Sequence, residues 1–577
     1  MPQGKRKTPF SGKAKKEQLK TKKQSKNFTL DDHKIQKQEN FDEEASPSIR
    51  KINIQPTKNI SHSNKYVLQF HNETKEELKE RRELARQSLK KVLEKELEIN
   101  GDNYFLKDLD FPKRPPWSFE MTREQLEAKE QKYFKEYIST IEEKFNWRDL
   151  SFFELNLETW RQLWRVLEMS DIVLFIVDIR FAGLMFPSSL YDYVVNVLNK
   201  DMILILNKID LSPVPLVAAW KRYFTEKYPN LHVLMFTTMP GYNLLGKQSD
   251  KAGLQIRRRK GRLRMAAEGT QLLLDACKNI VGNDIDLSSW QEKIKEETML
   301  EFEDNENIEI GETKDETVDV GYFEHEKYKG GVLTIGCIGQ PNVGKSSILN
   351  AIKGKKVVSV SKTPGHTKHF QTIYLTNNVR LCDCPGLIFP SKVPKPLQVL
   401  MGSFPIAQLK EPFTSIQYLA ERLDLVKILR IDHPEGDDEW SAMDICDGWA
   451  KKRGYLTAKA ARLDSYRAAN SLLRMALDGK ICLSLMPPGY VERKDYWQSH
   501  PDVEVVKWIL ARGTQTSENN GHDPNVSDDD VSIKTSAGSG DTKEGDSSCG
   551  ENSEDDESGV QVSFTRANKF AALSTED

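Results

Sequence analysis

Short continuous apolar runs in the first half of the chain predict a layer of buried parallel strands. The run IVLFIV begins at Ile172, MILIL begins at Met202 and LHVLMFTT begins at Leu231. A strand covered by helices on both faces is apolar throughout rather than alternating, and the helix-like residues 190–199 would supply a crossover. This pattern indicates an α/β fold built from β-α-β units.

Helices are expected in the part of the chain that precedes these strands. Polar stretches at residues 75–98 and 122–144 have helical character, and the proline-rich segment DFPKRPPW separates them. Ser151 and Glu154 have the spacing of a capping box, which predicts the start of a third helix. The apolar face of that helix consists of Leu157, Trp160, Leu163, Trp164 and Leu167. This helical spacing favours the two tryptophans as core residues rather than as a platform for a ligand.

A further strand, a hairpin and a group of helices are expected in the second half. GVLTIGCI indicates a strand, and FQTIYLTNNVRLCDC indicates a hairpin that turns at Asn377 and Asn378. The amphipathic stretches after the hairpin span residues 413–431, 442–452 and 464–477. A turn and a short strand are expected after the last stretch. This half therefore adds strands to the sheet and ends in a mainly helical region.

The segment GQPNVGKSS satisfies the phosphate-binding pattern G-x-x-x-x-G-K-[ST] in full. It follows a strand-like run and precedes the helix-like run SSILNAI, and a chance match would rarely have this setting. In such a loop backbone amides surround phosphate oxygens, Lys345 reaches the β and γ phosphates, and the Ser346 hydroxyl ligates magnesium. The residues expected to form this cradle are Gly339, Asn342, Val343, Gly344, Lys345, Ser346 and Ser347.

The segment DCPG ends the next apolar strand, and its aspartate lies 44 residues after Gly339, a spacing that suits a GTPase. Asp383 would hold magnesium through water, and the Gly386 amide would face a γ-phosphate. Thr367, between the two motifs, is the candidate switch threonine, which ligates magnesium only when the γ-phosphate is present. An ordinary turn threonine is the alternative. The predicted catalytic residues are Lys345, Thr367 and Gly386, and the predicted magnesium ligands are Ser346, Thr367 and Asp383.

The segment NKID at residues 207–210 supplies base specificity. The Asp210 carboxylate would accept from N1 and the exocyclic amine of guanine, and it would disfavour adenine, which lacks both donors. Asn207 would tie this loop to the phosphate cradle, and the stem of Lys208 would cover the base. NKID lies 132 residues before Gly339, whereas an ordinary GTPase has it after DxPG. The motif order is therefore circularly permuted: NKxD, then the P-loop, then DxPG.

Charge is segregated along the 577 residues, although 84 Lys+Arg nearly balance 86 Asp+Glu. The resulting net charge of -2 neither requires nor excludes a polyanionic partner. Residues 1–26 carry ten Lys/Arg and one Glu, and the run RRRKGRLR ends a basic insertion at residues 239–266. Both basic segments are typical of RNA contact or nuclear import, with a solvated tail and loop as the alternatives. Residues 296–326 carry 13 Asp/Glu and one Lys, which predicts an acidic linker.

Composition also separates the chain into parts and excludes several classes of protein. The longest apolar runs fall far below the roughly 18 residues that cross a bilayer, and no apolar segment behind the basic N-terminus marks the chain for secretion. We therefore expect an intracellular protein with no membrane partner. The seven cysteines show no C-x-x-C pair, which argues against a disulfide framework or structural zinc. Ser527 and Ser553, in the acidic tail, are candidate phosphorylation sites.

The expected divisions are a disordered basic arm at 1–70, a helical extension at 71–150, a circularly permuted GTPase domain at 151–390, a mainly helical domain at 391–510 and a disordered acidic tail at 511–577.

The permuted order, with the runs SFFELNLETWRQLWRVLEMSDIVLFIVDIR and CDCPGLIFPS, resembles the circularly permuted GTPases that act in ribosome assembly. The resemblance covers roughly residues 100–510. It implies a P-loop GTPase fold, GTP or GDP with Mg²⁺, slow hydrolysis, and association with ribosomal or pre-ribosomal RNA and protein. It also implies a nuclear and nucleolar location, with shuttling to the cytoplasm. The chain departs from the family at DIRFAG, where D-A-R-x-P is usual, and at Thr237-Thr238, where the fifth box has Ser-Ala.

Two residues bear on the rate of hydrolysis. Leu387 stands where Ras-like enzymes orient the attacking water with a glutamine, so we predict slow intrinsic turnover that a partner accelerates. Asn342 stands where potassium-stimulated GTPases ligate the ion, which makes K⁺ a hypothesis. Two functions stay open: a GTP-dependent switch in ribosome or RNP assembly, and a nuclear regulatory or signalling scaffold in which GTP binding is structural. The basic segments would bind RNA or the nuclear import machinery.

Overall fold

The structure is a computed structural model that describes residues 52–54, 69–71, 73–239, 266–300, 326–355, 357–358, 371–457 and 461–511. All of these belong to the first of two compact units, Met1–Glu518. The predicted features that lie outside the described residues are most of the basic arm, the run RRRKGRLR, most of the acidic linker, Thr367, the two candidate phosphorylation sites and the acidic tail.

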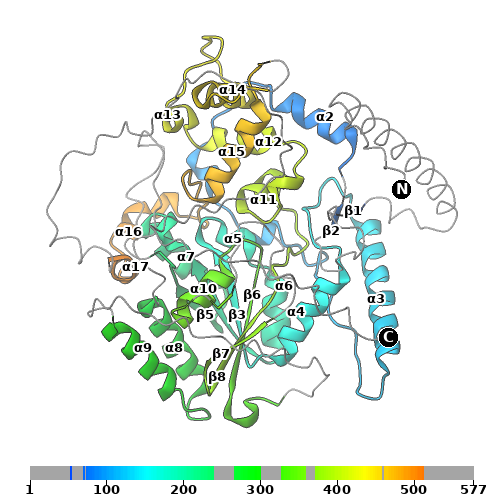
Figure 1. Ribbon diagram of the computed structural model, residues 1–577, viewed down its shortest axis with the longest axis vertical. Helices are drawn as coiled ribbons and strands as arrows, with labels where there is room; N and C mark the ends of the chain where they lie inside the picture. The colour runs from blue at the N-terminus through cyan, green and yellow to red at the C-terminus, as the bar shows by residue number, and fades with distance from the viewer. Residues whose placement is uncertain are drawn as a thin grey trace, which may run out of the picture. The chain divides into compact units, whose positions relative to one another are not determined.

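A six-stranded sheet with the strand order β5-β4-β3-β6-β8-β7 lies at the centre of the fold (Figure 1). The strands are β3 (Ile172–Asp178), β4 (Asp201–Asn207), β5 (Leu231–Met235), β6 (Leu333–Gly339), β7 (Gln371–Thr376) and β8 (Val379–Asp383). Neighbouring strands are parallel except for β7 and β8, which form the expected hairpin. Every residue of β3 and β6 is buried, which confirms that the continuous apolar runs are strands covered on both faces.

Helices pack around the sheet, as an α/β fold requires. Those of the sheet region are α4 (Leu157–Met169), α5 (Ala182–Met185), α6 (Ser188–Asp192), α7 (Val214–Lys227), α8 (Ala267–Val281), α9 (Ser288–Leu300) and α10 (Lys345–Lys353). Figure 1 shows α4 and α6 to the right of the sheet and α8 and α9 to its left. The helix expected between β3 and β4 is α6 together with the π-helical turn Tyr193–Val197. No helix among the described residues is long and apolar enough to span a bilayer.

The predicted start of α4 is wrong. The helix begins after Asn156, whose side chain accepts from the Glu158 amide, so Ser151 and Glu154 do not form a capping box. Residues 151–155 are not helical, and they bond to the chain that follows DCPG. The Ser151 amide donates to Ser391 O at 2.9 Å, and the Glu154 amide donates to Ile388 O at 3.1 Å. These bonds anchor the segment after DCPG to the residues that precede α4.

Only part of the helix expected at residues 75–98 is present. The helix α2 covers only Lys75–Leu84, and a short 3₁₀ turn follows at Glu94–Leu97. The chain between them bonds instead to the C-terminal helical region. The Leu89 amide donates to Trp440 O, in the loop before α14, and the Val92 amide donates to Glu421 O of α12. The second expected helix is confirmed as α3 (Arg123–Lys144). The first strands of the chain, β1 (Ile52–Ile54) and β2 (Gln69–His71), pair antiparallel.

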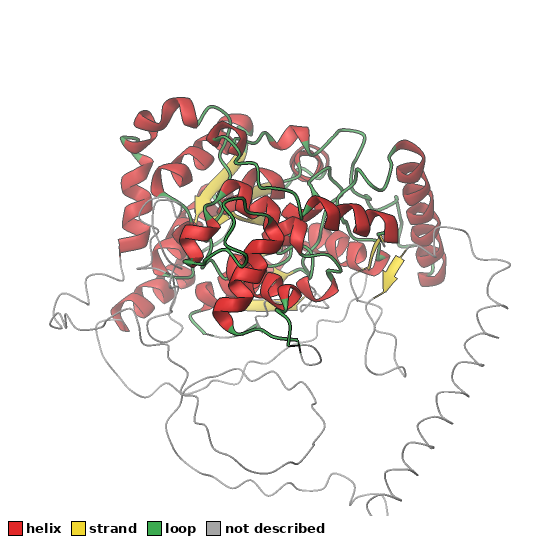
Figure 2. Ribbon diagram, turned by 90° about the horizontal axis from the view of Figure 1, so that it is seen from above, coloured by secondary structure: helices red, strands yellow, loops and turns green. Residues whose placement is uncertain are grey.

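The region after the sheet is mainly helical, as expected. Its helices are α11 (Lys395–Met401), α12 (Phe413–Arg422), α13 (Leu425–Leu429), α14 (Ala442–Arg453), α15 (Ser465–Leu477), α16 (Lys494–Gln498) and α17 (Asp502–Ala511). The stretch 413–431 is two helices because Asp424 caps a new one. The short strand expected after α15 is wrong, since that segment makes only an isolated bridge between Met486 and Glu98. Figure 2 shows the strands of the central sheet lying among the helices.

Candidate nucleotide-binding site

The predicted motif residues meet at one edge of the sheet. Asp178, Asn207, Gly339 and Asp383 each end a parallel strand, on β3, β4, β6 and β8. Asp178 and Asn207 are register partners, and Asp383 is opposite Cys337 of β6. Ligands of open α/β sheets bind outside the carboxyl ends of the strands, which makes this edge the candidate site.

The phosphate-binding loop has the backbone that its sequence requires. Gly344 has φ 101° at the N-cap of α10, and a Cβ atom there would collide with the side-chain amide of Asn207. Val343 is buried, and Lys345, Ser346 and Ser347 form the first turn of α10. The free amides at the start of this helix are therefore directed toward the sheet edge, where they can bind an anion.

Lys345 lies folded against the loop. Its Nζ donates to the carbonyl oxygens of Gly339 at 3.1 Å and Gln340 at 2.8 Å. Burial lowers the pKa of Lys345, while the charge of Asp383 opposes this shift. A buried ammonium group that bonds to two carbonyl oxygens is suited to bind a negatively charged ligand.

Asp383 and Ser346 form the candidate magnesium site. The Ser346 hydroxyl donates to Asp383 Oδ2 at 3.3 Å, whereas Asp383 Oδ1 is buried and has no hydrogen-bond partner among the described residues. Burial raises the pKa of Asp383 to about 6, despite the charge of Lys345 and the Ser346 hydroxyl. An unsatisfied, buried carboxylate oxygen fits a hard cation or its bound water.

Gly386 closes this part of the site. A Cβ atom on Gly386 would lie 2.8 Å from Pro341 Cα and 3.1 Å from Lys345 Nζ. The backbone of the DCPG loop can approach the phosphate loop this closely only because residue 386 lacks a side chain. Leu387, next to it, is fully buried, and its amide donates to Gly339 O at 3.2 Å.

The NKID segment reaches the phosphate loop directly. Asn207 Nδ2 donates to Val343 O at 2.7 Å, and Lys208 Nζ donates to Asn342 O at 2.7 Å. Asn207 Oδ1 is buried without a hydrogen-bond partner in the described part of the chain. Two motifs separated by 132 residues in the sequence are thus parts of one site.

Asp210 is fully buried, and Thr237 holds it. The Thr237 hydroxyl donates to Asp210 Oδ1 at 2.8 Å and accepts from the Met239 amide at 3.0 Å. From the sequence, Thr237 was noticed only as a departure from the Ser-Ala of the fifth box. The contact shows that this threonine orients the carboxylate that is the candidate for base recognition.

Two further contacts of the phosphate loop were missed from the sequence. The Asn342 side-chain amide donates to Gly402 O at 2.9 Å, and the Ser403 hydroxyl donates to Gln340 Oε1 at 2.6 Å. Gly402 is the C-cap of α11, so the end of that helix holds two side chains of the loop. In the sequence, these contacts could have been suspected only from Gln340 and Asn342, two polar side chains inside the glycine-rich motif.

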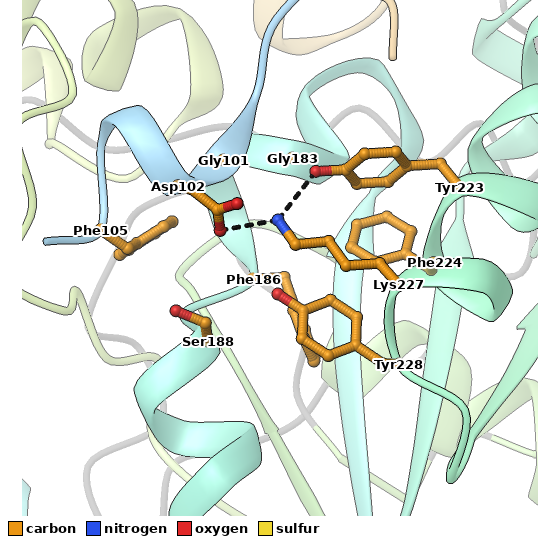
Figure 3. A pocket seen from close by; sticks show the side chains of 10 residues that line it. All are labelled: Gly101, Asp102, Phe105, Gly183, Phe186, Ser188, Tyr223, Phe224, Lys227 and Tyr228. Atoms are coloured by element: carbon orange, nitrogen blue, oxygen red, sulfur yellow. Dashed lines mark hydrogen bonds and ion pairs between the residues drawn. The ribbon is translucent and has the colours of Figure 1, made fainter. Parts of the chain in front are cut away.

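A cavity elsewhere is too small to be a ligand site (Figure 3). It measures about 10 Å³ and is lined in part by Lys227. The Lys227 Nζ donates to Asp102 Oδ1 at 2.6 Å and to the Tyr223 hydroxyl at 3.0 Å. A volume of this size holds one water at most.

The sequence of this chain is similar to those of known GTP-binding proteins. Residues 334–433 match the model of the 50S ribosome-binding GTPase family. Guanine nucleotide-binding protein-like 1 of Mus musculus is 45% identical over 545 residues, covering 88% of this chain and 89% of that protein. Large subunit GTPase 1 of Saccharomyces cerevisiae is 33% identical over 401 residues, covering 67% of this chain and 59% of that protein.

Among solved structures, the crystal structure of GNP-bound YlqF from T. maritima aligns with 57% of this chain and 98% of its own. The identity is 17% and the TM-score is 0.33. The family is assigned from the sequence relatives, which match over most of the chain. The fold, the meeting of the three motifs at one sheet edge and these relatives agree, and the chain belongs to the guanine nucleotide-binding protein-like 1 family of P-loop GTPases.

Proposed function

We propose that this protein is a nucleotide switch that binds GTP and GDP at this sheet edge and hydrolyses GTP slowly. The observation that carries the proposal is the hydrogen bond from Asn207 to Val343 O, which joins the base-recognition loop to the phosphate loop. In this proposal Asp210 reads the guanine edge, Lys208 covers the base and the loop amides hold the phosphates.

Magnesium belongs to the same proposal. Ser346, Asp383 and Thr367 would hold the ion, which would neutralise charge on the phosphates. Lys345 and the Gly386 amide would bind the γ-phosphate. The side chain of Leu387 has no polar atom with which to orient water, so intrinsic hydrolysis is slow and a partner accelerates it. Potassium beside Asn342 is a second cofactor of the proposal.

The proposed partner is a ribosomal or pre-ribosomal particle of RNA and protein. The support comes from the match to the 50S ribosome-binding GTPase family and from the similarity to a large subunit GTPase. We place the protein in the nucleus and nucleolus, with shuttling to the cytoplasm, and assign RNA contact or import to its basic segments. The division into a GTPase domain at 151–390 and a helical domain at 391–510 is also part of the proposal.

Sedimentation of the full chain with pre-ribosomal particles tests this function. We expect co-sedimentation with a non-hydrolysable GTP analogue and release with GDP, because the γ-phosphate would order the switch. Lys345→Met should abolish the nucleotide dependence. Lys353→Met, at the far end of the same helix, is the matched control and should retain it. Co-sedimentation that is identical in both nucleotide states would favour the scaffold function instead.

A further inference from the structure

We propose that Asp178 and Arg180 are positioning residues for guanine recognition, which set the place of Lys208 and rest the NKID loop on the C-terminal helical region. This inference rests on the proposed function of the site. It concerns the segment DIRFAG, in which Asp178 and Arg180 match the family's D-A-R-x-P and Ile179 and Ala182 depart from it.

Asp178 joins two cations at the end of β3. Its Oδ2 accepts from Arg180 Nη2 and from Lys208 Nζ, both at 2.8 Å, and its Oδ1 accepts from Arg180 Nε at 3.0 Å. Asp178 and Arg180 are almost completely buried. Although burial alone would raise the pKa of Asp178, the charges of Arg180 and Lys208 hold it well below its ordinary value. The carboxylate is therefore ionised whenever the protein is folded near neutral pH.

Lys208 depends on this carboxylate for its position. Its backbone is left-handed, with φ 61°, and its side chain crosses from β4 to the phosphate loop. The ammonium group has two of its bonds fixed, one to Asp178 and one to Asn342 O. A four-carbon side chain has many rotamers, so a fixed ammonium group fixes the stem that would cover the base.

Arg180 extends the same contacts into the helical region. Its Nη1 donates to Ala476 O at 2.8 Å in the last turn of α15, and its carbonyl accepts from the Leu485 amide at 2.8 Å. A cation is favourable at a helix C-terminus, where carbonyls lack intrahelical partners. The guanidinium thus bonds to the base-recognition side of the site and to the end of α15 at once.

A second contact joins the same two regions. Leu211 directly follows Asp210, and it packs on the turn after α15. A Cβ atom on Gly479 would lie 2.6 Å from Leu211 Cδ2, so the turn has no room for a side chain there. Leu211 and Cys482 form a small buried cluster of their own. The loop that would read guanine is therefore supported from behind by residues 476–485.

The test is a double-mutant cycle on the affinity of the full chain for fluorescent GDP. The four proteins are wild type, Asp178→Asn, Lys208→Met and the double variant. We expect Asp178→Asn to raise the Kd about tenfold or more, the usual range for loss of a hydrogen bond to a charged group. In the Lys208→Met background the same change should have little further effect, because Asp178 acts through Lys208.

Two controls separate positioning from loss of structure. Asp171→Asn removes a buried aspartate before the opposite end of β3, where it accepts from the Thr334 amide at 2.7 Å, and it should leave the Kd unchanged. If Asp178→Asn does not fold, Asp178→Asn with Arg180→Met avoids an unpaired buried guanidinium and takes its place in the cycle.

Different outcomes would contradict the proposed function and the positioning role of Asp178. A wild-type protein that binds no guanine nucleotide would contradict the proposed function. A wild-type protein that binds GDP, together with an Asp178→Asn effect of the same size with and without Lys208, would overturn the positioning role and leave the function standing. An unchanged Kd for Asp178→Asn would also overturn it.

Discussion

Asn342 of the phosphate loop bonds to two segments outside it. Its backbone is left-handed, with φ 59°, its carbonyl accepts from Lys208, and its side-chain nitrogen donates to Gly402 O. The contact with Gly402 fixes the amide so that Oδ1 is the atom left for an ion. The potassium hypothesis and the contact with α11 are therefore compatible.

GTP hydrolysis in two salts tests this residue. We expect the wild-type protein to turn over several-fold faster in potassium chloride than in sodium chloride, and we expect Asn342→Ala to lose the difference because Oδ1 is gone. Asn378→Ala, in the hairpin turn between β7 and β8, is the control and should keep it. Equal wild-type rates in the two salts would rule out potassium activation.

The placement of single residues was predictable where it depends on the local sequence. Lys345, Ser346 and Gly344 belong to one nine-residue motif, and its loop and helix have the predicted form. The partner of Asp210 was not predictable in this way. Thr237 lies two residues beyond the end of β5, and its hydroxyl meets the carboxylate because β4 and β5 are neighbours in the sheet.

At the scale of elements, a buried ionic cluster holds α3 against α4. Glu130 of α3 is 2% exposed and accepts from Arg114 Nε at 3.2 Å and Arg161 Nε at 2.7 Å. Arg161 belongs to α4, and Arg114 lies in the proline-rich segment before α3. The cluster therefore ties the N-terminal extension to a helix that packs on the sheet.

Neutralising this carboxylate should destabilise the protein. We expect Glu130→Gln to lower the free energy of unfolding by about 2 kcal/mol, since two guanidinium groups lose a shared buried carboxylate, while Arg114 keeps Glu168 and Arg161 keeps Glu158. Urea unfolding measures this change. Glu136→Gln lies on the exposed side of the same helix and should change stability by less than about 0.5 kcal/mol. Equal unfolding curves for the two variants would contradict the role given to the cluster.

The central strands were predicted better than helix boundaries, for a physical reason. β3, β4 and β6 are mainly apolar and almost wholly buried, and a strand covered on both faces shows this continuous pattern. The ends of α2 and α4 depend on distant segments instead. Residues 151–155 have helix-compatible spacing, yet they pair with the chain near Ile388, a contact that local spacing does not encode.

At the scale of the molecule, the permuted order places the base-recognition strand before the phosphate loop in the chain but beside it in space. β3 lies between β4 and β6, so both halves of the site are joined through it. The C-terminal helices contact both halves as well, with Gly402 on the phosphate loop and Ala476 on Arg180. A conformational change in either half of the site would therefore act on the same helical region.

The central claim is that NKID and the phosphate loop form one guanine-nucleotide site. Titration with a fluorescent GDP, competed by GTP, ATP and XTP, tests it on wild type and Asp210→Asn. Asp201→Asn, at the opposite end of β4, is the matched control. We predict that the wild type and the control prefer guanine and that Asp210→Asn transfers the preference to xanthine, because its amide complements the altered base edge. Absence of guanine binding, or binding that is indifferent to Asp210, would contradict the account.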